Sequence, residues 1–439
     1  MTYPMIKYLN KKMSYVVLIT IFAGLYLITG CTAQKKISNQ NKQHEEVVSV
    51  KEKGITEESL NCITCHEQRA ITHGWIADWQ GSMHARKGVG CEVCHVNFAE
   101  ESGLKEATEL EYLITGECNC DDKRVSRHVI AGKCGKCHIK QYNEFMKSRH
   151  SISWERMLAS SQYMAITKEV RTEKCEQCHN IQFKCDSCHT RHTFDTFEAK
   201  TPEACRTCHM GPDNPHYEIY ISSKHGAVYT ASQSNILRES QSIRSLRSPV
   251  CVTCHMPLGD HDIGSGIAYG PVGNAVSYID RNGLTVNEVE LLKRRNDMLT
   301  VCNECHSPYF TKETLKTADS VHAHVNSIVT EVKEIVSGIG KDGLVPPFID
   351  KLQNTALPYH VLMLKNSQTR EIKSRIERSF YKLIGDASVT WKGAYHMNPN
   401  YSHLYGWTDL QKDLNEIKEE SEKLRERAEI RRRLETKLR

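Results

Sequence analysis

The pattern Cys-x-x-Cys-His occurs eight times between residues 62 and 306, and it restricts what this chain of 439 residues can fold into. Two thiols three residues apart can form thioethers to the two vinyl groups of one porphyrin, and the next imidazole then falls on its iron. The chain holds 19 Cys and 22 His, a content at which chance gives far less than one match. The pattern therefore predicts eight covalently bound haem c groups, at motifs one to eight: Cys62, Cys65 and His66; Cys91, Cys94 and His95; Cys134, Cys137 and His138; Cys175, Cys178 and His179; Cys185, Cys188 and His189; Cys205, Cys208 and His209; Cys251, Cys254 and His255; Cys302, Cys305 and His306.

Two other uses of paired cysteines compete with this interpretation. Cys-x-x-Cys pairs also suit the tetrahedral zinc of zinc knuckles, and an exported chain can oxidise its thiols into a disulfide framework. Neither alternative explains why a histidine follows the second cysteine every time.

Eight haem groups would replace much of an ordinary hydrophobic core. Aromatic residues make up only 7% of the chain, and most segments between motifs are too short for large β-structures. We therefore expect a mainly α, multihaem cytochrome c fold, with helices and loops around eight c-type haems and a long C-terminal helix. The net charge of +5, with both signs mixed, gives no case for nucleic-acid binding.

The chain divides by composition into four parts. Residues 1–31 have a basic start, an apolar stretch and a final Cys31, which is typical of a signal peptide with a lipoprotein-type cleavage site; an uncleaved helical anchor is the alternative. Residues 32–60 are polar and are expected to form a flexible tether. Residues 61–409 then form the octahaem cytochrome c domain, and residues 410–439 a charged helix. We expect the protein to be exported and anchored on the periplasmic side of a membrane.

A low-spin haem needs a sixth ligand, usually a second histidine. Three histidines outside the motifs share the local pattern Ser-x-His and are predicted to be distal ligands: His84, His150 and His225. The remaining places are open to others, of which His73, His192, His216, His324 and His396 are candidates. Motifs four, five and six lie between Cys175 and His209, so their haems should be close neighbours that exchange electrons quickly.

Several sequence blocks resemble the octahaem hydroxylamine oxidoreductase family over about residues 60 to 410. They are Cys185 to His192, Pro202 to Gly211, Ser223 to Gly226, and Cys254-His255-Met256-Pro257. The resemblance implies seven bis-histidine haems and a catalytic fourth haem with an open distal face, here the haem of Cys175, Cys178 and His179. It also implies a homotrimer.

In that family an Asp-His pair and a Tyr lie over the catalytic haem, and the similar positions here are Asp260, His261 and Tyr359. A histidine beside a carboxylate can move protons, and a Tyr hydroxyl can orient an iron-bound nitrogen compound. The alternative is that His261 is one more haem ligand and Asp260 a solvated turn residue.

The direction of the reaction depends on a tyrosine. Oxidative members of the family cross-link a C-terminal Tyr of a neighbouring subunit to the catalytic haem. Tyr401 and Tyr405 are the candidates here, but the extended C-terminal part of long oxidative members is missing. We therefore expect an oxidoreductase that reduces nitrite, nitric oxide or hydroxylamine, served by a redox partner cytochrome or a quinol-linked donor or acceptor. The alternatives are hydroxylamine or hydrazine oxidation at a Tyr-cross-linked haem, reduction of sulfur oxyanions, or electron transfer without catalysis.

The C-terminal segment has a heptad pattern of small and apolar residues, in the order Leu410, Leu414, Ile417, Ser421, Leu424 and Ala428. It predicts a long helix that either lies on its own subunit or, as the trimeric resemblance implies, is shared between subunits.

Overall fold

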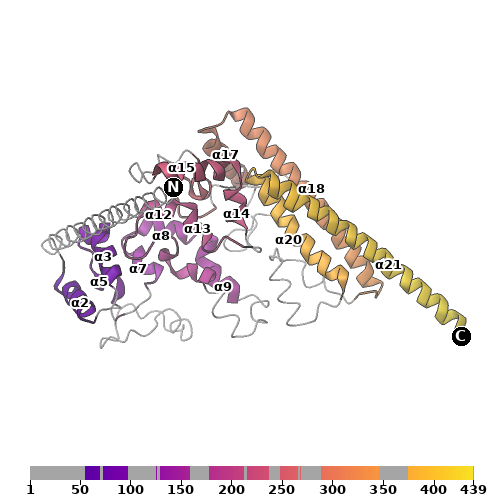
Figure 1. Ribbon diagram of the computed structural model, residues 1–439, viewed down its shortest axis with the longest axis horizontal. Helices are drawn as coiled ribbons and strands as arrows, with labels where there is room; N and C mark the ends of the chain where they lie inside the picture. The colour runs from indigo at the N-terminus through magenta and orange to yellow at the C-terminus, as the bar shows by residue number, and fades with distance from the viewer. Residues whose placement is uncertain are drawn as a thin grey trace, which may run out of the picture. The chain divides into compact units, whose positions relative to one another are not determined.

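The computed structural model describes residues 55–69, 73–96, 125, 129–158, 177–211, 215–236, 248–264, 267, 288–345 and 374–438. Every regular element in these ranges is a helix, and their extended backbone pairs only in an isolated bridge between Val96 and Val125. The predicted mainly α class is confirmed (Figure 1). None of the helices described is both long and apolar enough to cross a membrane. The predicted signal segment, tether start and Tyr359 lie outside the described residues.

The chain forms two compact units, Met1–Arg127 with Arg191–Phe194, and His128–Thr190 with Asp195–Arg439. In the first unit, the helices are α2 (Glu57–Gln68), α3 (His73–Gly81), α4 (Met83–Arg86) and α5 (Cys91–His95). Ser59 on α2 joins the first two motifs, because its hydroxyl donates to the Glu92 carboxylate at 2.5 Å and accepts from the Cys91 amide at 2.9 Å. A Cβ at Gly90 would lie 2.1 Å from that hydroxyl, so only glycine allows this close approach.

Most elements of the second unit that carry haem motifs are short. A single turn is enough, because the two thiols and the imidazole of one motif span five residues. In order, the elements of this unit before its three longest helices, with or without motif residues, are α7 (Ala131–Gly135), α8 (Ile139–Phe145), η2 (Arg149–Ile152), α9 (Ser153–Leu158), η3 (Asn180–Phe183), η4 (Cys185–Ser187), α12 (Thr196–Lys200), α13 (Pro202–Arg206), α14 (His216–Ile221), α15 (Lys224–Ile236), α16 (Cys251–His255), η6 (Pro257–Gly259) and α17 (Glu288–Asn303).

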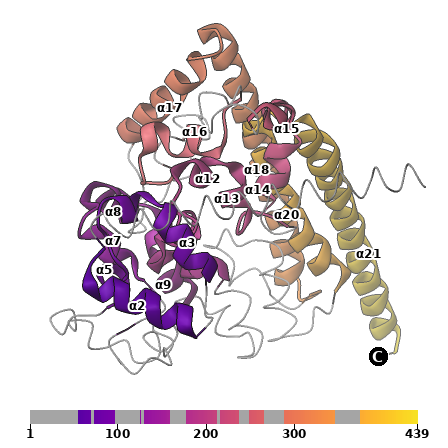
Figure 2. The same ribbon diagram turned by 60° about the vertical axis from the view of Figure 1, so that its left-hand side comes forward.

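Three long helices supply the apolar core of the second unit. They are α18 (Pro308–Lys341), α20 (Arg375–Tyr395) and α21 (Thr408–Leu438), and the short π-helical element η7 (Asn400–Trp407) joins the last two. The helices lie side by side in Figure 1 and Figure 2. Ser307 caps α18 by accepting from the Phe310 amide, and Pro308 occupies its first turn.

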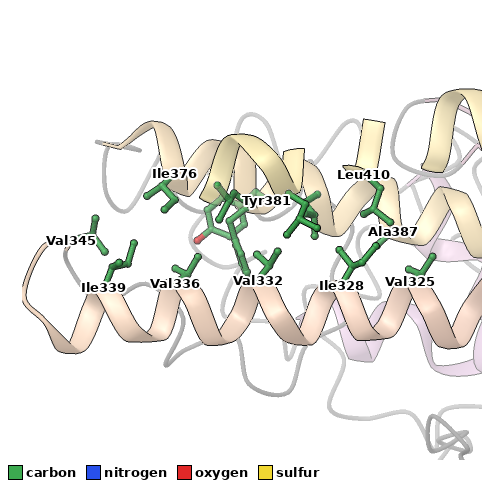
Figure 3. Packing of buried hydrophobic residues seen from close by; sticks show 14 residues of the cluster. Val325, Ile328, Val332, Val336, Ile339, Val345, Ile376, Tyr381, Ala387 and Leu410 are labelled. Atoms are coloured by element: carbon green, nitrogen blue, oxygen red, sulfur yellow. The ribbon is translucent and has the colours of Figure 1, made fainter. Parts of the chain in front are cut away.

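The core follows the helical period along α18 and faces apolar side chains of α20 and α21 (Figure 3). Each fully buried aliphatic or aromatic side chain contributes about 1.5–3 kcal/mol of transfer free energy. The buried set is Val325, Ile328, Val332, Val336, Ile339, Val345, Ile376, Phe380, Tyr381, Leu383, Ala387, Leu410, Leu414 and Ile417.

The predicted C-terminal helix is observed as α21, and its first half lies on its own subunit. Leu410, Leu414 and Ile417 are buried against α18 and α20. Beyond Ser421 no residue of α21 is fully buried, and α21 runs on past the other two helices (Figure 1). Packing within the subunit therefore accounts for the heptad pattern as far as Leu424, which is partly buried against the same core.

Candidate haem-binding site

Thiols of different motifs touch one another within the second unit. The thiols of Cys178 and Cys208, from motifs four and six, lie within hydrogen-bonding reach. The same holds for Cys205 and Cys251, from motifs six and seven. It also holds for motifs three and five, through Cys134 and Cys185. These contacts agree with the expectation that the middle motifs are close neighbours.

The histidines of five motifs each face a second imidazole. Two imidazoles that bind opposite sides of one metal ion, each with its nitrogen about 2 Å away, have ring centres about 6 Å apart. The observed separations are 6.2 Å for His95 and His192, 6.4 Å for His189 and His261, 6.0 Å for His209 and His150, 6.3 Å for His255 and His396, and 6.1 Å for His306 and His225. The chain's residues therefore fit bis-histidine haem iron.

The other predicted distal ligands do not each face a motif histidine of their own. His216 meets His209 edge-on, with ring centres 5.2 Å apart, so it competes with His150 for that motif. His324 lies against Trp407 at 4.7 Å, and His84 meets the edge of Phe194 at 5.1 Å. The side chain of His73 is outside the description. The distal roles of these four residues stay predictions.

Hydrogen bonds direct several of these imidazoles. An imidazole whose Nδ1–H donates to a backbone carbonyl presents Nε2 to a metal in a fixed direction. Nδ1 of His261 lies 2.9 Å from the Gly259 carbonyl, and Nδ1 of His396 lies 2.8 Å from the Lys392 carbonyl. Burial lowers the pKa of both His150 and His255 to about 4, which favours the neutral form that binds iron.

Left-handed backbone occurs at or beside three of the paired histidines. His192 itself has φ of +69°, Met397 after His396 has +52°, and Leu258 before His261 has +57°. Side chains other than glycine adopt this region at a cost, so it marks sites where the surrounding structure imposes the conformation. The sequence analysis did not predict left-handed backbone at these positions.

The structure does not place the predicted catalytic residues Asp260 and His261 beside the fourth motif. His261 stacks on His189 of motif five, with the ring planes 12° apart. The backbone amide of His261 donates to the Glu144 carboxylate at 3.1 Å, and Asp260 accepts from the Asp262 amide at 2.9 Å, as in a turn. This placement favours the alternative in which His261 is a haem ligand, and the catalytic role of the pair stays a prediction. Sequence reasoning missed Glu144, which lies 117 residues before His261 and carries no motif.

The fourth motif differs from the five paired ones. Among the residues that the structure describes, no second imidazole contacts the His179 ring, and Nδ1 of His179 lies 3.3 Å from the Ser153 carbonyl. Cys175 and Tyr359 of the predicted site are outside the description.

Neither a disulfide nor a cluster of metal ligands occurs in the described ranges. All described motif cysteines are free of disulfides there. Nor do three or more His, Cys, Asp or Glu side chains converge anywhere in the same ranges as a metal cage would need.

Comparisons with known proteins agree with this chemistry. A family model described as seven times multi-haem cytochrome CxxCH matches residues 58–351, a range that contains all eight motifs. The probable nitrite reductase-hydroxylamine oxidoreductase fusion protein of Kuenenia stuttgartiensis is 25% identical over 452 residues, which cover 83% of this chain and 51% of that protein. The chain thus spans about half the length of this curated relative.

Two solved structures share the fold. A chain of the reducing HAO-like protein complex of Kuenenia stuttgartiensis superposes with a TM-score of 0.65 at 23% identity, covering 89% of this chain and 88% of its own. A hypothetical multiheme protein superposes with a TM-score of 0.63 at 16% identity, covering 88% and 99%. The predicted multihaem cytochrome fold is therefore confirmed.

Proposed function

Because the chain belongs to the multi-haem cytochrome CxxCH family, we propose that it is an octahaem c-type oxidoreductase that converts small inorganic nitrogen compounds at one open-faced haem. The names of a curated relative and of a solved structure with the same fold, which include hydroxylamine oxidoreductase and HAO-like, support this proposal. The number eight rests on the eight motifs, each of which has the residues for one thioether-bound haem.

One observation carries the proposal of a substrate site. Each of five motif histidines faces a partner imidazole with ring centres 6.0 to 6.4 Å apart, whereas His179, among the described residues, has a backbone carbonyl at Nδ1 and no facing imidazole. Three motifs lie outside these pairs, and the family resemblance implies that the fourth is the open one. An iron held on one side only can take an exogenous ligand, so the fourth haem is the proposed reaction site, as the family resemblance implies.

The chain's own residues have separate tasks in this proposal. A bound haem supplies iron that takes a nitrogen compound and exchanges electrons with it. His179 would hold the group, and motifs six and seven, whose thiols lie near those of motifs four and six, would hold groups that pass electrons to it. Proton supply is assigned to Tyr359, and to Asp260 and His261 if His261 is not bound to iron.

The proposed direction is reduction of nitrite, nitric oxide or hydroxylamine. Nitrite reductase and hydroxylamine oxidoreductase both occur in the name of the curated relative. The alternative, oxidation of hydroxylamine or hydrazine, needs a Tyr cross-link. Tyr401 and Tyr405 pack on each other with ring centres 5.5 Å apart, and Tyr405 is 60% exposed and thus accessible to a second chain. A non-catalytic electron-transfer protein is the second alternative.

The proposal includes a location and partners. The segment 1–31 would export the chain and hold it at the periplasmic side of a membrane through lipid on Cys31. There it would exchange electrons with a cytochrome or a quinol-linked partner, as a homotrimer.

Titration with nitric oxide and cyanide tests the open iron. We expect one ligand bound for every eight haems counted by the pyridine haemochromogen assay, together with dye-linked reduction of nitrite or hydroxylamine faster than hydroxylamine oxidation. Binding by no haem would leave the electron-transfer alternative. A haem peptide containing Cys175 and Cys178 joined to a peptide of Tyr401 or Tyr405 would instead support oxidation.

A further inference from the structure

Two interactions join His179 to Ser153, the first residue of α9. The Ser153 hydroxyl donates to the His179 carbonyl at 2.6 Å, and Nδ1 of His179 faces the Ser153 carbonyl at 3.3 Å. The two residues are 26 positions apart, so this is a tertiary contact and not a local turn. It fixes both the backbone and the ring of the proximal histidine.

The side chain of Gln182, three residues after His179, also binds the first turn of α9. Its amide oxygen accepts from the backbone amides of Trp154 at 2.9 Å and Glu155 at 3.1 Å, and its amide nitrogen donates to the Glu155 carboxylate at 2.8 Å. The first amides of a helix have no partner within the helix, and here a side chain of η3 satisfies two of them. Gln182 is only 8% exposed, so losing it would leave buried donors without acceptors.

The same stretch of chain holds a ligand of a second haem. His150, three residues before Ser153, faces His209 of motif six with ring centres 6.0 Å apart. Motifs four and six also touch through Cys178 and Cys208. The residues from His150 to Glu155 therefore connect the sixth haem's proposed distal ligand with the fourth haem's proximal one.

We propose that Ser153 and Gln182 are positioning residues for the proposed substrate haem. By holding the Ser153 carbonyl against Nδ1 of His179, they fix the tautomer, direct Nε2 at the iron and keep the proximal bond strong opposite the substrate. The acceptor is a neutral carbonyl rather than a carboxylate, so the imidazole keeps its Nδ1 proton. This inference rests on the proposed function, because it takes the fourth haem to be the one with an open face.

Electron paramagnetic resonance of the reduced, fully loaded protein with nitric oxide as probe reads the proximal bond directly. With the bond intact the nitric oxide complex is six-coordinate; when the proximal histidine is released it becomes five-coordinate, with a distinct three-line signal. We expect wild type to be six-coordinate, and Ser153→Ala and Gln182→Leu to shift a major fraction to the five-coordinate signal at unchanged haem content.

The chain provides a matched control at another haem histidine. The Ser248 hydroxyl donates to the His225 carbonyl at 2.6 Å, the same bond as between Ser153 and His179. Ser248→Ala should therefore leave the nitric oxide signal in its six-coordinate form.

The outcomes separate this inference from the proposed function. If wild type binds no nitric oxide, the open haem itself is refuted. If wild type binds it and Ser153→Ala matches both wild type and Ser248→Ala, the positioning role is refuted and the open haem stands. Ser153→Ala removes only one hydroxyl group. If Gln182→Leu fails to fold, the comparison of Ser153→Ala with wild type and Ser248→Ala still decides the outcome.

Discussion

At the scale of single residues, two of the histidines that face a motif histidine share one arrangement. His261 and His396 turn Nδ1 toward a backbone carbonyl, and both stack on a motif histidine, with ring planes 12° and 23° apart. A carbonyl at Nδ1 leaves Nε2 as the metal-facing nitrogen.

The two roles of His261 predict different spectra. If it binds the iron of motif five, His261→Ala converts one low-spin haem to high-spin and adds a second site for cyanide. Asp260→Asn is the matched control, because the amide oxygen can still accept from the Asp262 amide, and it should leave the spectra unchanged. Low-spin spectra retained in His261→Ala, with turnover lowered by about 10²- to 10⁴-fold, would establish the proton-transfer role instead.

Sequence reasoning reached the residues whose chemistry is local. Thioether attachment needs two cysteines and a histidine within five positions, so each motif could be found by itself. The Ser-x-His pattern predicted His150 and His225, which do face motif histidines. It could not indicate which motif each one serves. Nor could it indicate that Glu144 would accept from the His261 amide or Gln182 from the Trp154 amide, because those contacts arise only when distant segments fold together.

At the scale of elements, α20 and α21 meet through a charged cluster beside the apolar core. Lys382 donates to Asp386 at 2.8 Å and to Asp413 at 2.9 Å. Burial and the neighbouring Asp413 raise the pKa of Asp386 to about 7, although Lys382 opposes the shift. One lysine thus serves two carboxylates, of which Asp413 is almost fully buried.

This cluster predicts a pH dependence of stability. A carboxyl whose pKa is higher in the folded than in the unfolded chain stabilises the fold below its unfolded pKa, and that contribution is lost as pH rises through the folded value. We expect the contribution of Asp386 to the free energy of unfolding to fall by on the order of 2 kcal/mol between about pH 4 and pH 8. It is measured as the difference between wild type and Asp386→Asn, with unfolding followed by the helical circular dichroism signal.

Two variants check the assignment to Asp386. Asp386→Asn cannot ionise and should flatten the pH dependence. Glu331→Gln, in an exposed ion pair with Lys418 between α18 and α21, should leave it in place. Equal pH profiles for wild type and Asp386→Asn would contradict the prediction.

At the scale of the whole molecule, the second half of α21 presents an apolar stripe to solvent. Ile430, Leu434 and Leu438 are 58%, 56% and 87% exposed and follow one another at intervals of four residues. At about 100° per residue this stripe lies about 120° around the helix from the face that Leu410 and Ile417 bury. It is therefore a separate contact surface from the one used within the subunit.

We expect this stripe to form a subunit contact of the proposed trimer. The double variant Ile430→Ser and Leu434→Ser should shift the sedimentation velocity profile from trimer toward monomer. The double variant Arg431→Ser and Glu435→Ser changes neighbouring polar positions of the same helix and should stay trimeric. A monomeric wild type, or equal profiles for both variants, would exclude this role of the stripe.

The contacts between thiols of different motifs also bear on how the protein is made. Cys178 and Cys208, and likewise Cys205 and Cys251, come together only in the folded chain. Thiols so close can be oxidised to a disulfide, and an oxidising compartment favours that reaction. A chain that folded first would trap the cysteines that haem attachment needs. We therefore expect the thioethers to be made on a still-extended chain, before tertiary folding brings these thiols together.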